Sequence, residues 1–236
     1  MRSARFLIKA HRAHGARCAR VIKAHRAHGA RCARIIRIVT DQLSLSIWLT
    51  PQARRDRVKW FEKALHLFPF SQREQPQSAV LIQAISAAEP PLLERPLNGP
   101  LDVAAAMETF RDYQGDDIAY VLEGWWDLWQ FDKDWELRPA RVALSCFGPE
   151  FDNGTEQSAR EQEDFRIDFG VDSHFLPRTD IAGSAKLTES NIKSLLRLVH
   201  EWERVLPVEM RKLETESGEN FADRLQRMLT ASGGVA

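Results

Sequence analysis

The sequence lacks a long apolar run, a cysteine framework and a secretory signal. No stretch reaches about 18 apolar residues, which argues against a membrane-spanning helix, and stretches such as residues 78–88 have the length of a strand. The three cysteines (Cys18, Cys32 and Cys146) are too few for the disulfide framework of a small secreted domain. The N-terminus has no apolar centre of the kind a secretory signal needs. These absences predict a protein of the reducing cytoplasm without membrane contact.

The short motifs of catalysis and cofactor binding are also absent. The sequence contains no Gly-x-Ser-x-Gly nucleophile motif, no glycine-rich phosphate loop and no His-Glu-x-x-His zinc motif. Beyond the N-terminal segment the histidines are His66, His174 and His200, and isolated histidines are more often structural than catalytic. A triad built from distant segments stays open, because spatial neighbours need not be sequence neighbours. We predict no cofactor and no metal, and we favour a protein without catalytic activity.

Acidic residues are missing from the first 38 positions. That segment holds 11 of the 33 Lys and Arg and none of the 33 Asp and Glu, so the remainder carries 22 basic and 33 acidic residues. Residues 8–20 recur letter for letter at 22–34, and two identical copies are typical of a recent duplication rather than of a structural repeat. We predict a basic arm over residues 1–35, disordered or loosely helical, and a single α+β domain over residues 36–236.

The arm allows several interpretations. Its charge suits a polyanion such as nucleic acid, although Phe6 is its only aromatic residue and base stacking is not indicated. Each repeat places His-x-x-His before a Cys, and these are zinc ligands, but Gly15 and Gly29 interrupt the helix that would align them. An Arg-rich terminus without acids also imitates a mitochondrial transit peptide. The duplication itself favours an arm without selected function, or sequence read upstream of a true start.

Hydrophobic periodicity predicts the elements of an α+β fold. Alternation with a period of two predicts five strands, at residues 43–49, 79–85, 120–131, 140–147 and 165–171. Apolar stripes at helical spacing predict helices over residues 51–68, 102–113 and 188–205, the last of these capped by Thr188. A shorter helix is predicted from Pro207 and a final one from Ser217. The proline-rich residues 89–100 are expected to form a loop or an edge.

This order of elements predicts a mostly antiparallel sheet with helices packed on one face and further helices at the C-terminus. The strands between residues 120 and 171 form a meander, because each has one apolar face. The first half can be drawn as a split β-α-β unit of the ferredoxin-like kind.

The residues from Glu123 to Trp135 are the densest cluster of aromatic and acidic side chains. Four Trp and four carboxylates lie within these 13 residues. Tryptophan rings beside carboxylates are a common way to hold sugars or cationic side chains. Strand alternation places part of the cluster on one face together with charged residues of neighbouring strands, and Trp126 on the opposite, core face. The predicted binding surface consists of Glu123, Trp125, Asp127, Trp129, Arg141, Arg166 and Asp168.

The leading hypothesis is a non-enzymatic binding or accessory protein whose acidic, Trp-rich surface engages a basic protein partner. One alternative is a carboxylate-dependent hydrolase. As glycosidase carboxylates, however, Glu123 and Asp127 would stand roughly 13 Å apart on a strand, beyond even the spacing of inverting enzymes. A second alternative is polyanion binding through the basic arm. The aromatic face could also be ordinary packing, with cross-strand ion pairs.

Overall fold

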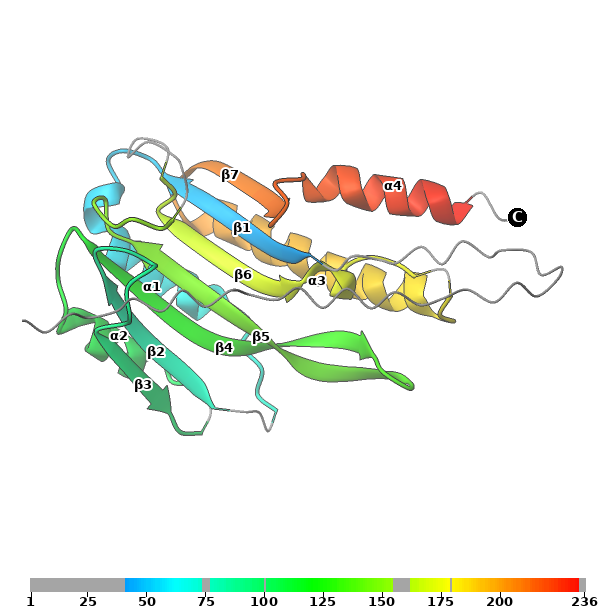
Figure 1. Cartoon of the computed structure of the whole chain (residues 1–236), viewed down its shortest axis with the longest axis horizontal. Helices are drawn as coiled ribbons and strands as arrows, with labels where there is room; N and C mark the ends of the chain where they lie inside the picture. Colours follow the sequence, from blue (N-terminus) through cyan, green and yellow to red (C-terminus); the bar gives the residue numbers. More distant parts are fainter. Residues whose placement is uncertain (1–40, 74–76, 100, 155–161, 179, 234–236) are drawn as a thin grey trace, which may run out of the picture. The chain divides into compact units, whose positions relative to one another are not determined.

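The computed structural model describes residues 41–73, 77–99, 101–154, 162–178 and 180–233 (Figure 1). Contacts along the chain group residues 39–236 into one compact unit. Its centre is a seven-stranded sheet with the order β3-β2-β4-β5-β6-β1-β7, in which every neighbouring pair is antiparallel. The predicted α+β class is thereby confirmed. The predicted arm, its repeat and its His and Cys residues lie outside the described residues.

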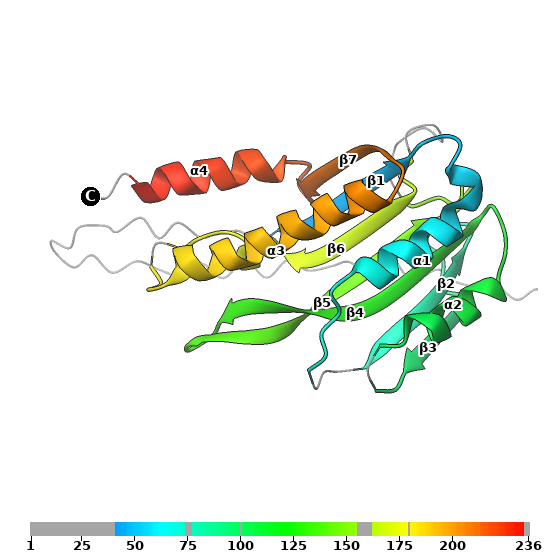
Figure 2. The same ribbon diagram turned by 180° about the vertical axis from the view of Figure 1, so that it is seen from behind.

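The elements follow the chain in this order: β1 (Gln42–Leu49), η1 (Arg54–Asp56), α1 (Arg57–Leu67), β2 (Ser78–Ala84), β3 (Leu93–Leu97), α2 (Val103–Arg111), β4 (Ile118–Phe131), β5 (Trp135–Phe147), β6 (Phe165–Val171), η2 (Asp172–His174), α3 (Ser184–Val205), β7 (Val208–Thr215) and α4 (Phe221–Gly233). Helices α1, α2 and α3 lie on one face of the sheet (Figure 2), as the apolar stripes predict. Helix α4 contacts β7. No helix in the described ranges has both the length and the apolar character to span a bilayer.

A split β-α-β unit is present in the first half of the chain. Strands β3 and β4 flank β2, and α2 connects them. The proline-rich residues 89–100 supply β3, which is an edge strand and therefore tolerates Pro96. The ferredoxin-like drawing, which joined the strands at residues 43–49 and 79–85 through the first helix, is wrong, because β4, β5 and β6 separate β1 from β2. The unit that is present uses β3, which was expected only as a loop or an edge.

Two expectations about the C-terminal part are wrong. The helix expected from Pro207 is the strand β7, which pairs with β1 through residues 208–215. The segment pairs with the otherwise unpaired backbone N–H and C=O groups at the edge of β1, and this pairing outweighs the weak helical preference of so short and charged a segment. Helix α3 begins at Ser184, so Thr188 does not cap it but donates a hydrogen bond to the Ser184 carbonyl at 2.7 Å.

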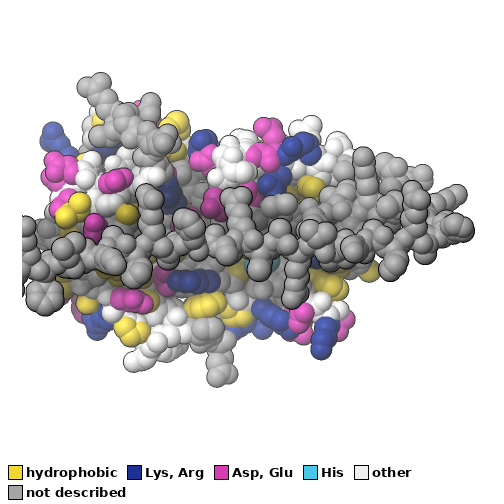
Figure 3. Space-filling view, viewed as in Figure 1, with side chains coloured by type: hydrophobic (Ala, Val, Ile, Leu, Met, Phe, Trp, Pro, Cys, Tyr) yellow, Lys and Arg dark blue, Asp and Glu magenta, His cyan; other side chains and the backbone are white. Residues whose placement is uncertain are grey.

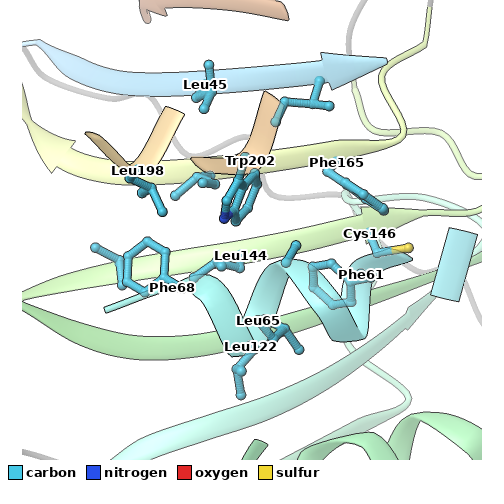
Figure 4. Close-up of a cluster of buried hydrophobic side chains, with 14 of the residues drawn as sticks. Leu45, Phe61, Leu65, Phe68, Leu122, Leu144, Cys146, Phe165, Leu198 and Trp202 are labelled. Carbon is cyan, nitrogen blue, oxygen red and sulfur yellow. The ribbon is translucent and has the colours of Figure 1, made fainter. Parts of the chain in front are cut away.

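The core lies between the sheet and its three helices. Phe61 of α1, Phe165 of β6 and Trp202 of α3 are each about 1% exposed and meet there (Figure 4), with the two Phe rings 5.5 Å apart. Trp126 is only 3% exposed, whereas Trp125 is half-buried on the other face. The prediction that Trp126 lies in the core and Trp125 is the more exposed is confirmed. The two keep opposite faces because the β4–β5 register runs without a bulge from residue 119 to residue 131.

Candidate functional site

The sheet face opposite α1, α2 and α3, here called the open face, carries all seven residues of the predicted surface. Residues 123, 125, 127 and 129 alternate along β4. Arg141 stands opposite Trp125 on β5, and Arg166 and Asp168 follow on β6 opposite residues 145 and 143. Figure 1 looks onto this face, with the helices behind it. Strand alternation alone was sufficient to predict that these residues share a face.

Three carboxylates stand in register across five strands, separated by small side chains. Pairing places Glu123 opposite Ala143, Ala143 opposite Asp168, Asp168 opposite Ser44, and Ser44 opposite Glu214. We call this set the acidic row. Each acid is two strands from the next, so the carboxylates repeat about every 9.5 Å. All three carboxylates are only partly exposed, at 24% for the Glu123 side chain and 20% for that of Glu214, and Asp168 is half-buried.

A row of cations borders the acidic row on one side. It contains Arg166 on β6 and Lys212 on β7, with Ser46 of β1 between them. The described atoms in Figure 3 accordingly show acidic and basic side chains interspersed, without a single field of one sign. The strand pairing places the acidic row beside Arg166 and Lys212, and this fixed order of charges favours recognition of a definite charge spacing.

Most acids on the open face already have partners. Arg141 forms an ion pair with Glu123, and Lys212 Nζ lies 2.6 Å from a Glu214 carboxylate oxygen. Asp127 accepts a 2.7 Å hydrogen bond from the hydroxyl of Ser71. These are the ordinary cross-strand and local pairs of a solvated surface. Each pair stabilises the fold by about 0.2–1 kcal/mol, so a cationic group of a partner can replace Arg141 or Lys212 at little cost in free energy.

Asp168 is the exception in the acidic row. Within the described ranges no donor or cation lies at hydrogen-bonding or ion-pair distance from its carboxylate, and its row neighbours Ala143 and Ser44 are small. Burial raises the pKa of Asp168 to about 6; the charge of Arg166 opposes this rise and that of Glu163 adds to it. Arg166 is itself engaged by Glu163 in an ion pair. Among the described residues, Asp168 therefore has no ion-pair or hydrogen-bond partner of its own, and only the more distant charge of Arg166 offsets its burial.

The other aromatic residue of the surface lies beside a small cavity of about 120 Å³. Trp129 lines it together with Phe131 and Trp135, and its backbone is held by Asn191 of α3 through two 2.9 Å hydrogen bonds. His174 also lines the cavity, and burial lowers the pKa of this imidazole. Its Nδ1 is buried and finds no partner in the part of the chain that the structure describes.

Glu123 and Asp127 have separate partners on the sheet surface. Glu123 and Asp127 line neither this cavity nor the two larger ones near α1. Asp127 is held by Ser71 and has Arg73 at 3.5 Å. Carboxylates fixed in surface pairs, without a shared cavity between them, suit recognition better than acid-base chemistry.

Sequence reasoning missed a cationic region at the start of α1. Two cavities of about 360 and 600 Å³ share the residues Arg55, Arg57 and Asp116. The signal was present in the sequence, since residues 54–59 contain four cations where a helix begins. The same two cavities are also lined by the carboxylates of Asp56, Asp116, Glu163 and Asp164, so the region is mixed in charge.

Comparisons with models of protein families, with curated proteins and with solved structures found no match to this chain.

Proposed function

We propose that this protein is a non-enzymatic binding protein whose open face holds a Lys- or Arg-rich segment of a protein partner, in the cytoplasm. The acidic row is the observation that supports the proposal most strongly. Its three carboxylates, spaced by small residues, form acceptors into which long cationic side chains can reach. The excess of acidic over basic residues beyond position 38 adds long-range attraction for such a partner.

The cost of burying the Asp168 carboxylate gives an energetic reason for binding a cation. Asp168 is half-buried and has no partner among the residues that the structure describes; such a carboxylate costs free energy, and its raised pKa reflects that cost. A cation placed over Asp168 removes the cost and holds the carboxylate in its charged form. The half-buried ring of Trp125 stands two positions along β4 from Glu123 and offers a surface for cation–π contact.

The hydrolase alternative has less support. Hydrolysis by a carboxylate pair requires both groups at one substrate atom, and Glu123 and Asp127 instead have separate partners on the surface. Polyanion binding through the basic arm rests on residues outside the described ranges, and no observation favours it over the open face.

Neutral variants of the acidic row test the proposal. The full chain is titrated with a synthetic Arg- and Lys-rich peptide by isothermal titration calorimetry, at low and at physiological ionic strength. Asp168→Asn and Glu123→Gln should each weaken binding about tenfold, the usual effect of one charge-assisted hydrogen bond. Binding should also weaken as salt rises, because steering and pairing are screened.

Glu108→Gln is the matched control, since Glu108 is an exposed acid on α2, on the other side of the sheet. It removes the same charge and should change affinity less than about twofold. An equal loss in all three variants would show that only net charge matters, and it would contradict a site on the open face.

A further inference from the structure

The cavity of about 120 Å³ beside Trp129 is lined by two segments that lie far apart in the sequence. The β4–β5 hairpin extends past the ends of the neighbouring strands (Figure 1), and its tip supplies three aromatic rings. The residues between β6 and the start of α3 supply polar side chains. The lining includes Trp129, Phe131, Trp135, Ser173, His174 and Arg178. None of these belongs to the acidic row, so the cavity is separate from the binding site proposed above.

Hydrogen bonds hold both sides of the cavity in place. The buried amide of Asn191 on α3 bonds the backbone N–H and carbonyl of Trp129, and it also donates to the His174 carbonyl at 2.7 Å. The indole N–H of Trp135 donates to the Ala182 carbonyl at 2.9 Å. Because the chain itself fixes these side chains, little conformational freedom is lost when a ligand enters.

The aromatic rings make the cavity suitable for a flat ligand. The rings of Phe131 and Trp135 have centroids 5.4 Å apart and are tilted by 56°. Phe131 is 40% exposed, so part of its apolar surface is in water and would be covered by a bound ring. A cavity of roughly 150 Å³ holds one benzene molecule, and the volume here is of the same order. The size therefore suits a single six-membered ring.

The lining is electrically neutral. Arg178 is the one cation among the described lining residues, and its guanidinium donates to the Asp180 carboxylate at 3.1 and 2.7 Å. The same part of the lining contains no carboxylate that would balance a cationic ligand. Burial lowers the pKa of His174, so this imidazole is uncharged at neutral pH. A neutral ligand fits such a lining better than an ion does.

His174 has hydrogen-bonding capacity that the described residues do not use. Its Nδ1 is buried and without a partner there, which leaves Nε2 as the nitrogen that a ligand in the cavity can reach. The hydroxyl of Ser173 lies on the same lining. A neutral imidazole nitrogen either donates or accepts, depending on the tautomer. A phenol hydroxyl can do both, so it can pair with His174 in either form.

We propose that this cavity binds the ring of a phenol, the chemistry that a tyrosine side chain of a protein partner shares with free phenolic metabolites. The ring packs among Trp129, Phe131 and Trp135, and its hydroxyl pairs with Nε2 of His174. A phenyl ring of the same shape leaves this nitrogen unpaired. The site should therefore prefer a tyrosine ring over a phenylalanine ring.

Nuclear magnetic resonance titration of the full chain with N-acetyl-tyrosinamide, N-acetyl-phenylalaninamide and p-cresol tests the site. The indole N–H signals of Trp129 and Trp135 report on the cavity. The tyrosine amide should bind saturably and about fivefold more tightly than the phenylalanine amide, the effect of one hydrogen bond. None of the three ligands is charged, so the result does not depend on the acidic row.

Two variants separate the ring contact from the hydrogen bond. Phe131→Ala should weaken the binding of both amides about tenfold, because it removes part of the aromatic wall. Phe131 is 40% exposed, so this variant should fold normally. His174→Leu should abolish the preference for the tyrosine amide. A change in fold alone would weaken both amides and leave their ratio unchanged.

Leu196→Ala is the matched control, because Leu196 is an apolar residue on α3 that is 57% exposed and does not line the cavity. It should leave each affinity within about twofold. Tighter binding of the tyrosine amide than of p-cresol would support a tyrosine side chain as the ligand, and the reverse would support a free phenol. Absence of saturable binding, equal affinity for the two amides, or an equal loss in Leu196→Ala and Phe131→Ala would overturn the proposal.

Discussion

At the scale of single residues, strand alternation determines what each tryptophan of β4 does. Trp126 packs between Phe68 and Phe169, with ring centroids 5.7 Å from each, whereas Trp125 is half-buried on the open face. Trp126→Ala should therefore lower the free energy of unfolding by about 3–5 kcal/mol, the cost of a large aromatic cavity. Trp125→Ala should cost clearly less. Denaturant unfolding measures both, and equal losses would contradict the assigned faces.

Asp168 should limit the stability of the protein above its own pKa. Its pKa is raised from 3.8 to about 6, so the penalty is absent below pH 4, grows between pH 4 and 6 and is complete above pH 6. Asp168→Asn should raise the free energy of unfolding at pH 8 by about 1–3 kcal/mol and change it little at pH 3.5. Urea unfolding at both pH values measures this, with Asp134→Asn at an exposed loop as control. A destabilised Asp168→Asn at pH 8 would show that the carboxylate is satisfied.

At the scale of elements, central strands could be predicted and edge strands could not. Strands β4, β5 and β6 have one apolar face each, and their alternation is long enough to predict both type and facing. Edge strands β3 and β7 carry proline or charges on mostly exposed positions, so their periodicity is weak. Their pairing partners, which the sequence does not reveal, determine their conformation.

The same limit applies to the candidate site. The seven predicted residues share a face because alternation is local. The full acidic row was not predictable, since Ser44 of β1 lies far from Asp168 in the sequence and Glu214 belongs to the misassigned strand β7. The lack of a partner for Asp168 among the described residues likewise depends on its small neighbours Ala143 and Ser44 on the adjacent strands.

A buried ion cluster holds helix α4 against the residues that flank β1 and β6. Arg224 Nη2 lies 2.8 Å from Asp172, which is fully buried, and Asp41 lies 3.5 Å from the same guanidinium. Arg224→Met leaves the Asp172 carboxylate buried without this cation and should lower stability at pH 7 by about 3–5 kcal/mol. Burial already raises the pKa of Asp172, and losing Arg224 raises it further.

The loss from Arg224→Met should therefore shrink at pH values below 4, where Asp172 is protonated in both states. Thermal or urea unfolding at pH 7 and pH 3.5 measures the difference. Adding Asp172→Asn to Arg224→Met should recover part of the stability at pH 7. A loss that is the same at both pH values would mean that packing of the Arg224 stem, and not its charge, holds α4.

At the scale of the whole molecule, the sheet separates two kinds of surface. One face is covered by α1, α2 and α3 (Figures 1 and 2) and holds the core. The open face carries the acidic row and, beside it, the cations Arg166 and Lys212. The central claim is that the open face, and the acidic row within it, binds a basic segment of a partner.

The most direct test of that claim is nuclear magnetic resonance mapping of the full chain titrated with an Arg- and Lys-rich peptide. The account predicts that the largest amide shifts fall on β4, β5, β6 and β1 around the acidic row, and that the Trp125 indole N–H shifts with them. It also predicts that Asp168→Asn reduces these shifts and Glu108→Gln does not. Shifts confined to the helices, or none at low salt, would contradict it.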